Sequence, residues 1–301
     1  MENLINNTTI TTNKDNYIKK YLEYIDVSKN TQKEYSIGLK MFFEYCSLNN
    51  INNIQRQDII NYREYLKLQG KSANTINLYL VSIKNFFKWL DYEGLYKDIS
   101  KNIKALPVET THIRQAISQD QIKLLLNNCQ DIKEKLIISL AITTGIRCNE
   151  MCNIRLQDFK QKDGKTILYV LGKARQGMKT DFVIIPDNIL NIIKQYIKQY
   201  NIIDYLFTSN SNNSKGKTLS TRTMRDIVNK IYERAGIKNE NVVFHSLRHG
   251  FASISIQNGV DIREVSQSLR HSNINVSMRY IHDLEMINNK CSDTISNLLF
   301  V

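Results

Sequence analysis

The segment Phe244-His245-Ser246-Leu247-Arg248-His249 opens a predicted helix over residues 246–258 that ends near Gly259. On a helix, His245, Arg248 and His249 share one face close to the positive end, which suits an anion. Two other interpretations stay open for this segment, a solvated polar helix start and a zinc site. The zinc-binding helix pattern needs Glu directly after the first histidine, and this chain has Ser246 there. We therefore expect no metal.

Two further segments place charged residues close to glycines that interrupt regular structure. Arg147 comes just after Gly145, and Glu150 follows three residues later. Taken alone, this spacing is typical of a surface ion pair that contributes less than ~1 kcal/mol. Lys173 lies in the glycine-containing turn of a predicted hairpin, between β-rich segments at 166–171 and 182–185.

The order of these residues along the chain is more specific than any one of them. Six positions form the set: Arg147, Lys173, His245, Arg248, His271 and Tyr280. In this order the sequence resembles the tyrosine recombinases, the integrase and Xer-type family of site-specific DNA recombinases. The resemblance covers nearly the whole chain, and residues 114–118 look like the family's entry to its catalytic domain. One departure is Arg270, which stands where many relatives have Gly.

The resemblance implies a role for each position. Strand cleavage by transesterification passes through a pentacoordinate phosphorus whose oxygens gain negative charge, and guanidinium forks suit such oxygens. The implied phosphate clamp is Arg147, Arg248 and His271. Tyr280 is the implied nucleophile, because a phenol can hold the 3′ phosphate as a phosphodiester.

Proton transfer falls to other positions of the same pattern. His245 matches the family's general base, since a phenol of pKa about 10 must lose its proton as the bond forms. Lys173 matches the acid that protonates the leaving 5′ oxygen, with Lys179 in the same hairpin as the fallback. Glu150 is expected to orient Arg147 or the histidines. Because the phosphotyrosine conserves bond energy, we expect neither ATP nor another cofactor.

Periodicity predicts a mainly α fold, and two prolines in 301 residues leave long helices uninterrupted. Four N-terminal helices are expected: one near Tyr17, one from a capping box at Thr31, one over 58–68 that stops at Gly70, and one from Ser72. A linker at 107–117 separates this domain, 1–106, from a second at 118–301. There we expect the hairpin and helices at 119–128, 132–143, 188–200, 221–234, 246–258 and 261–268. The resemblance implies a SAM-like core-binding domain followed by the recombinase catalytic fold.

The net charge of +12 points to a polyanionic partner. No stretch is long and apolar enough to span a bilayer, and five scattered cysteines fit reduced thiols, so we expect a cytoplasmic, nucleoid-associated protein without membrane contact. By resemblance, the fourth N-terminal helix and helix 221–234 enter DNA grooves. The expected DNA contacts are Lys71, Asn74, Thr75, Lys84, Lys217, Arg222 and Arg225. A solvated charged face is the alternative for these residues.

The resemblance also implies partners. We expect duplex DNA with an inverted-repeat core site, a homotetramer on two such sites or a heterotetramer with a related recombinase, and exchange through a Holliday junction. A bacterial, phage or mobile-element origin and docking of the apolar C-terminal tail in trans belong to the same expectation. Two rival functions remain at this point, a type IB topoisomerase and a catalytically idle DNA-binding regulator.

Overall fold

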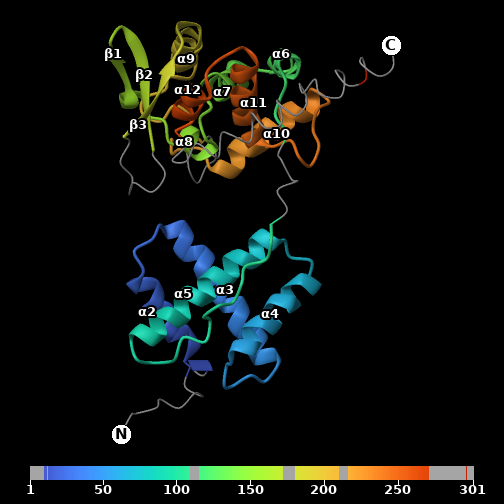
Figure 1. Cartoon of the computed structure of the whole chain (residues 1–301). Helices are drawn as coiled ribbons and strands as arrows, with labels where there is room; N and C mark the ends of the chain where they lie inside the picture. Colours follow the sequence, from blue (N-terminus) through green and yellow to red (C-terminus); the bar gives the residue numbers. More distant parts are fainter. Residues whose placement is uncertain are drawn as a thin grey trace. The chain divides into compact units, whose positions relative to one another are not determined.

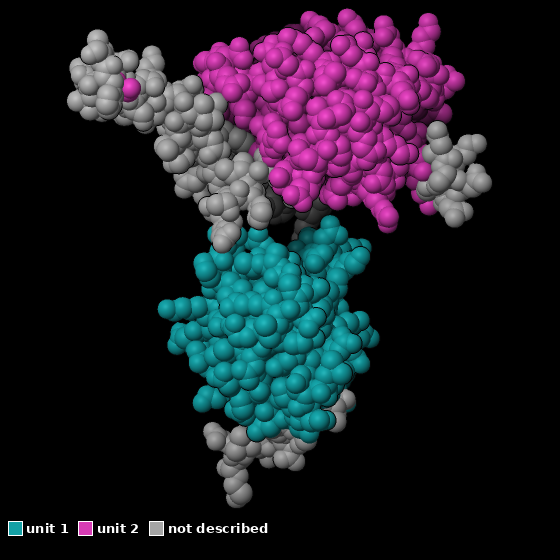
Figure 2. Space-filling model, turned by 90° about the vertical axis from the view of Figure 1, so that its right-hand side faces the viewer, with its two compact units in different colours: residues 1–111 teal, residues 112–301 magenta. Residues whose placement is uncertain are grey.

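The protein is described by a computed structural model in which residues 10–11, 13–108, 115–171, 180–209, 216–270 and Ser296 are placed. The chain divides into two compact units, Met1–Thr111 and His112–Val301, which are coloured separately in Figure 2. Each unit has its own hydrophobic core. No helix among the placed residues is long and apolar enough to cross a membrane.

The first unit is a helical bundle, as predicted. Its helices are α2 (Lys14–Tyr24), α3 (Lys29–Leu48), α4 (Arg56–Leu68) and α5 (Ala73–Tyr92). Aromatic side chains fill the centre, where Phe42 meets Tyr62 edge-on at a centroid distance of 5.2 Å and Phe43 meets Phe86 at 5.8 Å. Such edge-to-face pairs add to the free energy gained by burying the rings. The helices that carry these residues are visible in Figure 1.

The ends of these helices test the predicted capping signals. Gly70 has a left-handed φ of 68° just beyond α4, and Ser72 caps α5 by accepting the Thr75 N–H at 3.3 Å, so both signals were placed correctly. The predicted box at Thr31 was wrong. Helix α3 begins three residues earlier, because the Ser28 hydroxyl accepts the Thr31 N–H at 3.2 Å and serves as the cap.

The second unit is also mostly helical, with a small sheet. Its first helices are α6 (Gln119–Asn127), α7 (Ile132–Thr144) and the short α8 (Cys148–Cys152), followed by a 3₁₀ turn at Leu156–Asp158. The later helices are α9 (Asp187–Tyr200), α10 (Thr221–Arg234), α11 (Phe244–Gln257) and α12 (Ile262–Ser268). The predicted fold class is confirmed, and α10 has the predicted bounds.

The sheet is larger than the predicted hairpin. Strands β1 (Phe159–Lys162), β2 (Lys165–Val170) and β3 (Asp181–Ile185) pair antiparallel in the order β1-β2-β3, with Leu168 opposite both Phe159 and Val183. Strand β1 escaped prediction because its polar sequence Phe-Lys-Gln-Lys leaves only Phe159 partly buried. The sheet lies beside α9 at one side of this unit (Figure 1).

Helix α7 is central to the second core. It packs against α9 and α11, and its residues 136–141 are all buried, so this stretch is buried on every side. It ends at Gly145, whose left-handed φ of 58° favours glycine. A Cβ at Gly145 would also lie 2.6 Å from Leu269 Cδ2 and 2.9 Å from Phe251 Cδ1. Glycine therefore allows the chain leaving α7 to pass close beneath α11 and the end of α12.

Candidate active site

Arg147 and Glu150 sit at the start of α8, directly after the turn at Gly145. Arg147 is the N-cap residue, and Glu150 accepts its backbone N–H at 2.9 Å and its side-chain Nη1 at 2.7 Å. The Glu150 side chain is 4% exposed and that of Arg147 is 29% exposed. The pair is thus not the surface ion pair that its spacing alone suggested. Glu150 thus binds both the backbone and the guanidinium of Arg147.

Arg248 lies in the first turn of α11 and is 1% exposed. Its Nη1 donates to the carbonyl oxygen of Gly145, and its Nη2 donates to that of Leu269. A solvated helix start is therefore wrong for this residue. A single guanidinium fastens the turn that leads into Arg147 to the segment that follows α12.

His245 and His249 flank Arg248 on α11, and both are partly buried. Their rings pack edge-on with centroids 4.8 Å apart and planes at 88°. The helix therefore brings His245, Arg248 and His249 together in its first turns, as their spacing predicted. Within the placed ranges, no three His, Cys, Asp or Glu side chains gather in a group that could hold a metal ion.

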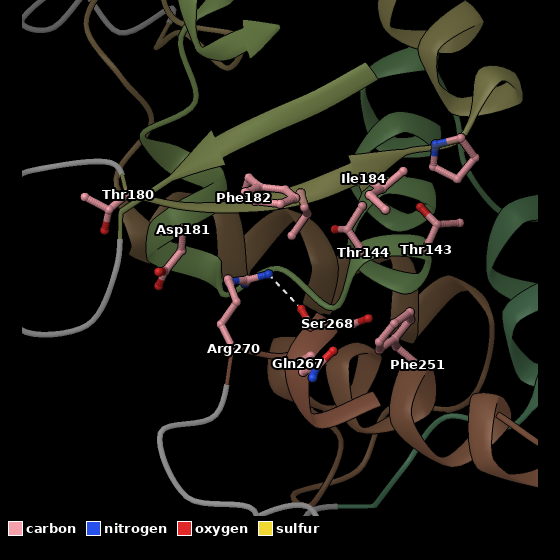
Figure 3. A pocket seen from close by; sticks show the side chains of 12 residues that line it. Thr143, Thr144, Thr180, Asp181, Phe182, Ile184, Phe251, Gln267, Ser268 and Arg270 are labelled. Atoms are coloured by element: carbon pink, nitrogen blue, oxygen red, sulfur yellow. Dashed lines mark hydrogen bonds between the residues drawn. The ribbon is translucent and has the colours of Figure 1, made fainter. Parts of the chain in front are cut away.

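Arg270 is the residue of this site that the sequence did not assign. Its Nη2 contacts Glu150 Oε2 at 2.7 Å, and its Nη1 donates to the Ser268 carbonyl at 2.9 Å, the dashed line in Figure 3. Its side chain is 7% exposed. The available signal was that Arg270, next to His271, departs from the pattern expected from the resemblance. That signal marked an unusual residue and did not reveal its partner.

Burial and charge act in opposite directions on the pKa of Glu150. Burial by itself raises the pKa of Glu150. The positive charges of Arg270 and Arg147, with the Arg147 hydrogen bonds, outweigh burial and hold this pKa below its usual value. For Arg270, burial lowers the guanidinium pKa and the charge of Glu150 opposes that change. Glu150, Arg147 and Arg270 thus form a cluster of one buried carboxylate and two guanidiniums. Its net charge is positive, which suits an anionic ligand.

The depressed pKa of Glu150 leads to a pH-dependent stability. A carboxyl whose folded pKa is low stabilises the fold above its unfolded pKa, about 4.3, and loses that contribution as the pH falls through the folded value. We expect Glu150→Gln to lower the free energy of unfolding by about 3 to 5 kcal/mol at pH 7, since it leaves the buried guanidinium of Arg270 without its carboxylate. Urea unfolding from pH 7 down to pH 3 should show this difference shrinking.

The matched control is Asp120→Asn in the same unit. Asp120 pairs with Lys123 at 3.2 Å, and its side chain is 93% exposed. Its loss should change stability by less than ~1 kcal/mol. A Glu150→Gln effect that is equally small at pH 7, or that does not vary with pH, would contradict the buried ion pair.

A cavity of about 580 Å³ adjoins the cluster. It lies between the end of α7, strand β3 and the end of α12, and Arg270 and Asp181 are neighbours in its lining (Figure 3). Its polar side chains come from all three elements: Thr143, Thr144, Thr180, Asp181, Gln267, Ser268 and Arg270.

The predicted DNA contacts differ in their surroundings. Five of them are exposed: Lys71, Asn74, Lys217, Arg222 and Arg225. Lys84 is partly buried, and its ammonium donates to the carbonyl oxygen of Ile103. The Thr75 hydroxyl lies 2.9 Å from that of Ser72 in the cap of α5. The positions of Lys84 and Thr75 thus have a structural explanation within the first unit.

Arg225 also touches the start of α8. The Cys148 thiol, which is buried, has a lowered pKa because of a hydrogen bond with Cys152 and the nearby charge of Arg225. Cys148 and Cys152, the first and last residues of α8, are both buried. Helix α10 therefore packs directly against the helix that carries Glu150.

Four of the predicted residues cannot be placed in this geometry. Lys173, Lys179, His271 and Tyr280 lie outside the described residues, as does the C-terminal tail apart from Ser296. The described part of the site consists of Arg147, Glu150, His245, Arg248 and Arg270. It brings two of the three clamp residues and the expected base into one unit, and it ends one residue before His271.

Comparison with known proteins identifies the family. The phage integrase family matches residues 115–286, and the N-terminal SAM-like domain of phage integrases matches residues 17–94. The chain belongs to the phage integrase family and is a tyrosine recombinase, an enzyme that transfers DNA strands in site-specific recombination.

Named relatives agree with this family. Tyrosine recombinase XerA of Pyrococcus horikoshii is 30% identical over 263 residues, covering 86% of this chain and 85% of that protein. A tyrosine recombinase of Agathobacter rectalis is 28% identical over 293 residues, covering 90% and 92%.

Solved structures support the fold. A XerH site-specific recombinase bound to its difH substrate in a pre-cleavage complex superposes with a TM-score of 0.72 at 20% identity, covering 94% of this chain and 97% of that one. A lambda integrase fragment, a dimer bound to a core site, gives 0.66 at 16% identity, covering 87% and 96%.

Proposed function

We propose that this recombinase cuts one DNA strand at a time by attack of Tyr280 on a phosphodiester. The phenol oxygen bonds to phosphorus, and the bond from phosphorus to the 5′ oxygen breaks. The 3′ phosphate is then held on the protein, and a 5′ hydroxyl from a partner duplex reverses the step and joins the strands through a Holliday junction. No ATP is needed, because one phosphodiester replaces another.

The observation that carries this proposal is the pair of hydrogen bonds from Arg248. They join the turn before Arg147 to Leu269, two residues before His271. The segment that leads into Arg147 and the segment that ends at Arg270 are thereby both bonded to Arg248, which supports the proposal. Glu150 engages one guanidinium nitrogen of Arg147, and the remaining N–H groups of this part-exposed side chain are suited to phosphate oxygens.

In this proposal, each proton has a donor and an acceptor. His245 accepts the Tyr280 proton as the phosphorus–oxygen bond forms, and Lys173, or Lys179 in the same hairpin, protonates the leaving 5′ oxygen. Arg147, Arg248 and His271 stabilise the negative charge that builds on the two non-bridging oxygens of the phosphate. For Arg248 to reach the phosphate, its N–H groups not bonded to Gly145 or Leu269 must face it, since the side chain is buried.

The wider assembly belongs to the same proposal. The exposed arginines of α10, Arg222 and Arg225, contact one half of an inverted-repeat duplex site together with Lys217. Lys71 and Asn74 do so from the first unit. Four copies, or copies of this chain with a related recombinase, act on two sites. The relatives solved on DNA, the XerH and lambda integrase complexes, are the precedent for binding a duplex core site.

The test begins with a duplex selected from a random library by binding to this protein. A labelled copy with a nick beside the cleavage point should give a covalent protein–DNA adduct on a denaturing gel, because the short cleaved end diffuses away. Plasmids with two selected sites should recombine. Relaxation of one-site plasmids without recombination of two-site plasmids would indicate a topoisomerase, and binding without any adduct would indicate a regulator.

A further inference from the structure

Glu150 is shared between two arginines that come from different parts of the chain. Its Oε1 accepts from Arg147 Nη1, and its Oε2 accepts from the Arg147 backbone and from Arg270 Nη2, at 2.7 to 2.9 Å. Hydrogen bonds to an ionised, buried carboxylate are among the stronger ones in proteins. Glu150 is therefore held from two sides, and the second side depends on Arg270.

The two arginines differ in what they can still contact. The Arg147 side chain is 29% exposed, whereas that of Arg270 is 7% exposed and both of its terminal nitrogens are engaged, by Glu150 and by the Ser268 carbonyl. Arg147 can present N–H groups to a ligand. Arg270 is turned inward, as a support behind Glu150.

The backbone at Arg270 is unfavourable for any residue but glycine. Its φ is +55°, in the left-handed region, which costs an L-residue roughly 1 kcal/mol relative to glycine. The position therefore needs a side chain whose contacts offset this cost. The buried ion pair with Glu150, at 2.7 Å, is a contact that can offset it.

Arg248 supplies a second link between the same two segments. It binds the carbonyl oxygen of Leu269, next to Arg270, and that of Gly145, two residues before Arg147. The Arg248 link thus holds two backbone carbonyl groups, whereas the Glu150–Arg270 link joins two side chains. Without the Glu150–Arg270 pair, the backbone stays fastened by Arg248, but among the described residues Glu150 keeps only Arg147 as a partner.

We propose that Arg270 is a positioning residue that holds Glu150, and through it the Arg147 guanidinium, in the orientation that receives the scissile phosphate. The proposal rests on the proposed function for its consequence in catalysis. The arrangement of the three side chains can be measured without any reaction.

The experiment compares Arg270→Gly, Arg270→Lys and the control Arg263→Ala. Glycine suits the left-handed backbone, so this variant removes the guanidinium without adding strain. Lysine keeps a positive charge beside Glu150 but lacks the planar fork that reaches two acceptors. The Arg270→Lys variant therefore remains for comparison if Arg270→Gly does not fold. Arg263 lies exposed on α12.

Two measurements are made on each full-length variant. The first is the mobility of the Arg147 side chain, from nitrogen relaxation of its Nε–H signal, assigned with Arg147→Lys. The second is the single-turnover rate of adduct formation on the nicked, library-selected duplex, together with the dissociation constant for that duplex.

We expect Arg147 to become mobile in Arg270→Gly and cleavage to slow about 10- to 100-fold, since misplacing a reacting group by about 1 Å can have an effect of that size. The dissociation constant should change less than ~3-fold, because a buried side chain adds little to the distributed phosphate contacts. For Arg270→Lys, the mobility of Arg147 and the cleavage rate should lie between those of Arg270→Gly and the wild type. For Arg263→Ala, both should match the wild type. Millimolar guanidinium ion should partly restore cleavage by Arg270→Gly.

Each contrary outcome is distinct. If Arg147 stays as rigid in the variants as in the wild type, Arg270 does not position it and the proposal is overturned, whatever happens to cleavage. If cleavage is unchanged while Arg147 becomes mobile, the positioning has no catalytic role and the proposal is again overturned. Failure of the wild type to form an adduct would instead refute the proposed function, and the mobility of Arg147 would still decide the structural link.

Discussion

Tyr280→Phe is expected to form no covalent adduct with DNA while binding the selected duplex as tightly as the wild type. The substitution removes only the phenolic oxygen, which is the nucleophile in the proposed reaction, and no other group on Phe can attack phosphorus. Removing the nucleophilic atom abolishes the reaction, whereas removing a group that only stabilises the transition state leaves a slow reaction. The measurement is a denaturing gel of the labelled, nicked duplex, with affinity measured by gel shift under native conditions.

The matched control is Tyr200→Phe. Tyr200 is the last residue of α9 and is 39% exposed. Its variant should form the adduct at the wild-type rate. An adduct from Tyr280→Phe would show that another side chain is the nucleophile, and weaker DNA binding by that variant would show that the tyrosine does more than attack.

Arg248→Ala is expected to damage both the fold and the reaction. The change removes the donors of two buried carbonyls, at Gly145 and Leu269, and each unsatisfied carbonyl costs about 1 to 3 kcal/mol. It also leaves a cavity where a fully buried side chain stood. Cleavage should fall by about 10³-fold or more, since one donor to a transition-state oxygen is worth about 10² to 10³.

Arg248→Lys separates these two effects. The ammonium keeps the charge and part of the volume, but it cannot bridge two carbonyls and a phosphate with a planar fork. We expect it to recover part of the stability in urea unfolding and little of the cleavage rate. The exposed Arg222→Ala is the control, with unchanged unfolding. Full activity of Arg248→Lys would contradict the bridging role.

The fold was predictable where local signals coincide with burial. Helix α10 combines a Ser220 cap with four buried residues on one face, and its predicted bounds were right. Helix α8 and strand β1 were not found, because five and four residues are too short to show a period. At Thr31, two hydroxyl residues three apart both fit a cap, and only the structure distinguished Ser28.

The sequence marked candidate residues for the site but did not reveal their environment. The order of Arg147, His245 and Arg248 marked them, but the spacing of Arg147 and Glu150 is the same in an exposed pair and a buried one. Burial depends on Arg270, which lies far along the chain, and on the close packing of Leu269 over Gly145. Such tertiary contacts leave no local pattern in the sequence.

In the proposed reaction, the buried guanidinium of Arg248 makes the ability to cut DNA a property of the finished fold. Its two carbonyl partners, Gly145 and Leu269, belong to segments far apart in the sequence, and α11, which carries Arg248, packs against α7 in the folded unit. A nascent or locally unfolded chain could still attract DNA through its lysines, but it would have no assembled clamp. With the role proposed for Arg248, the enzyme is inactive on DNA until folding is complete, and its cations are already arranged before DNA binds.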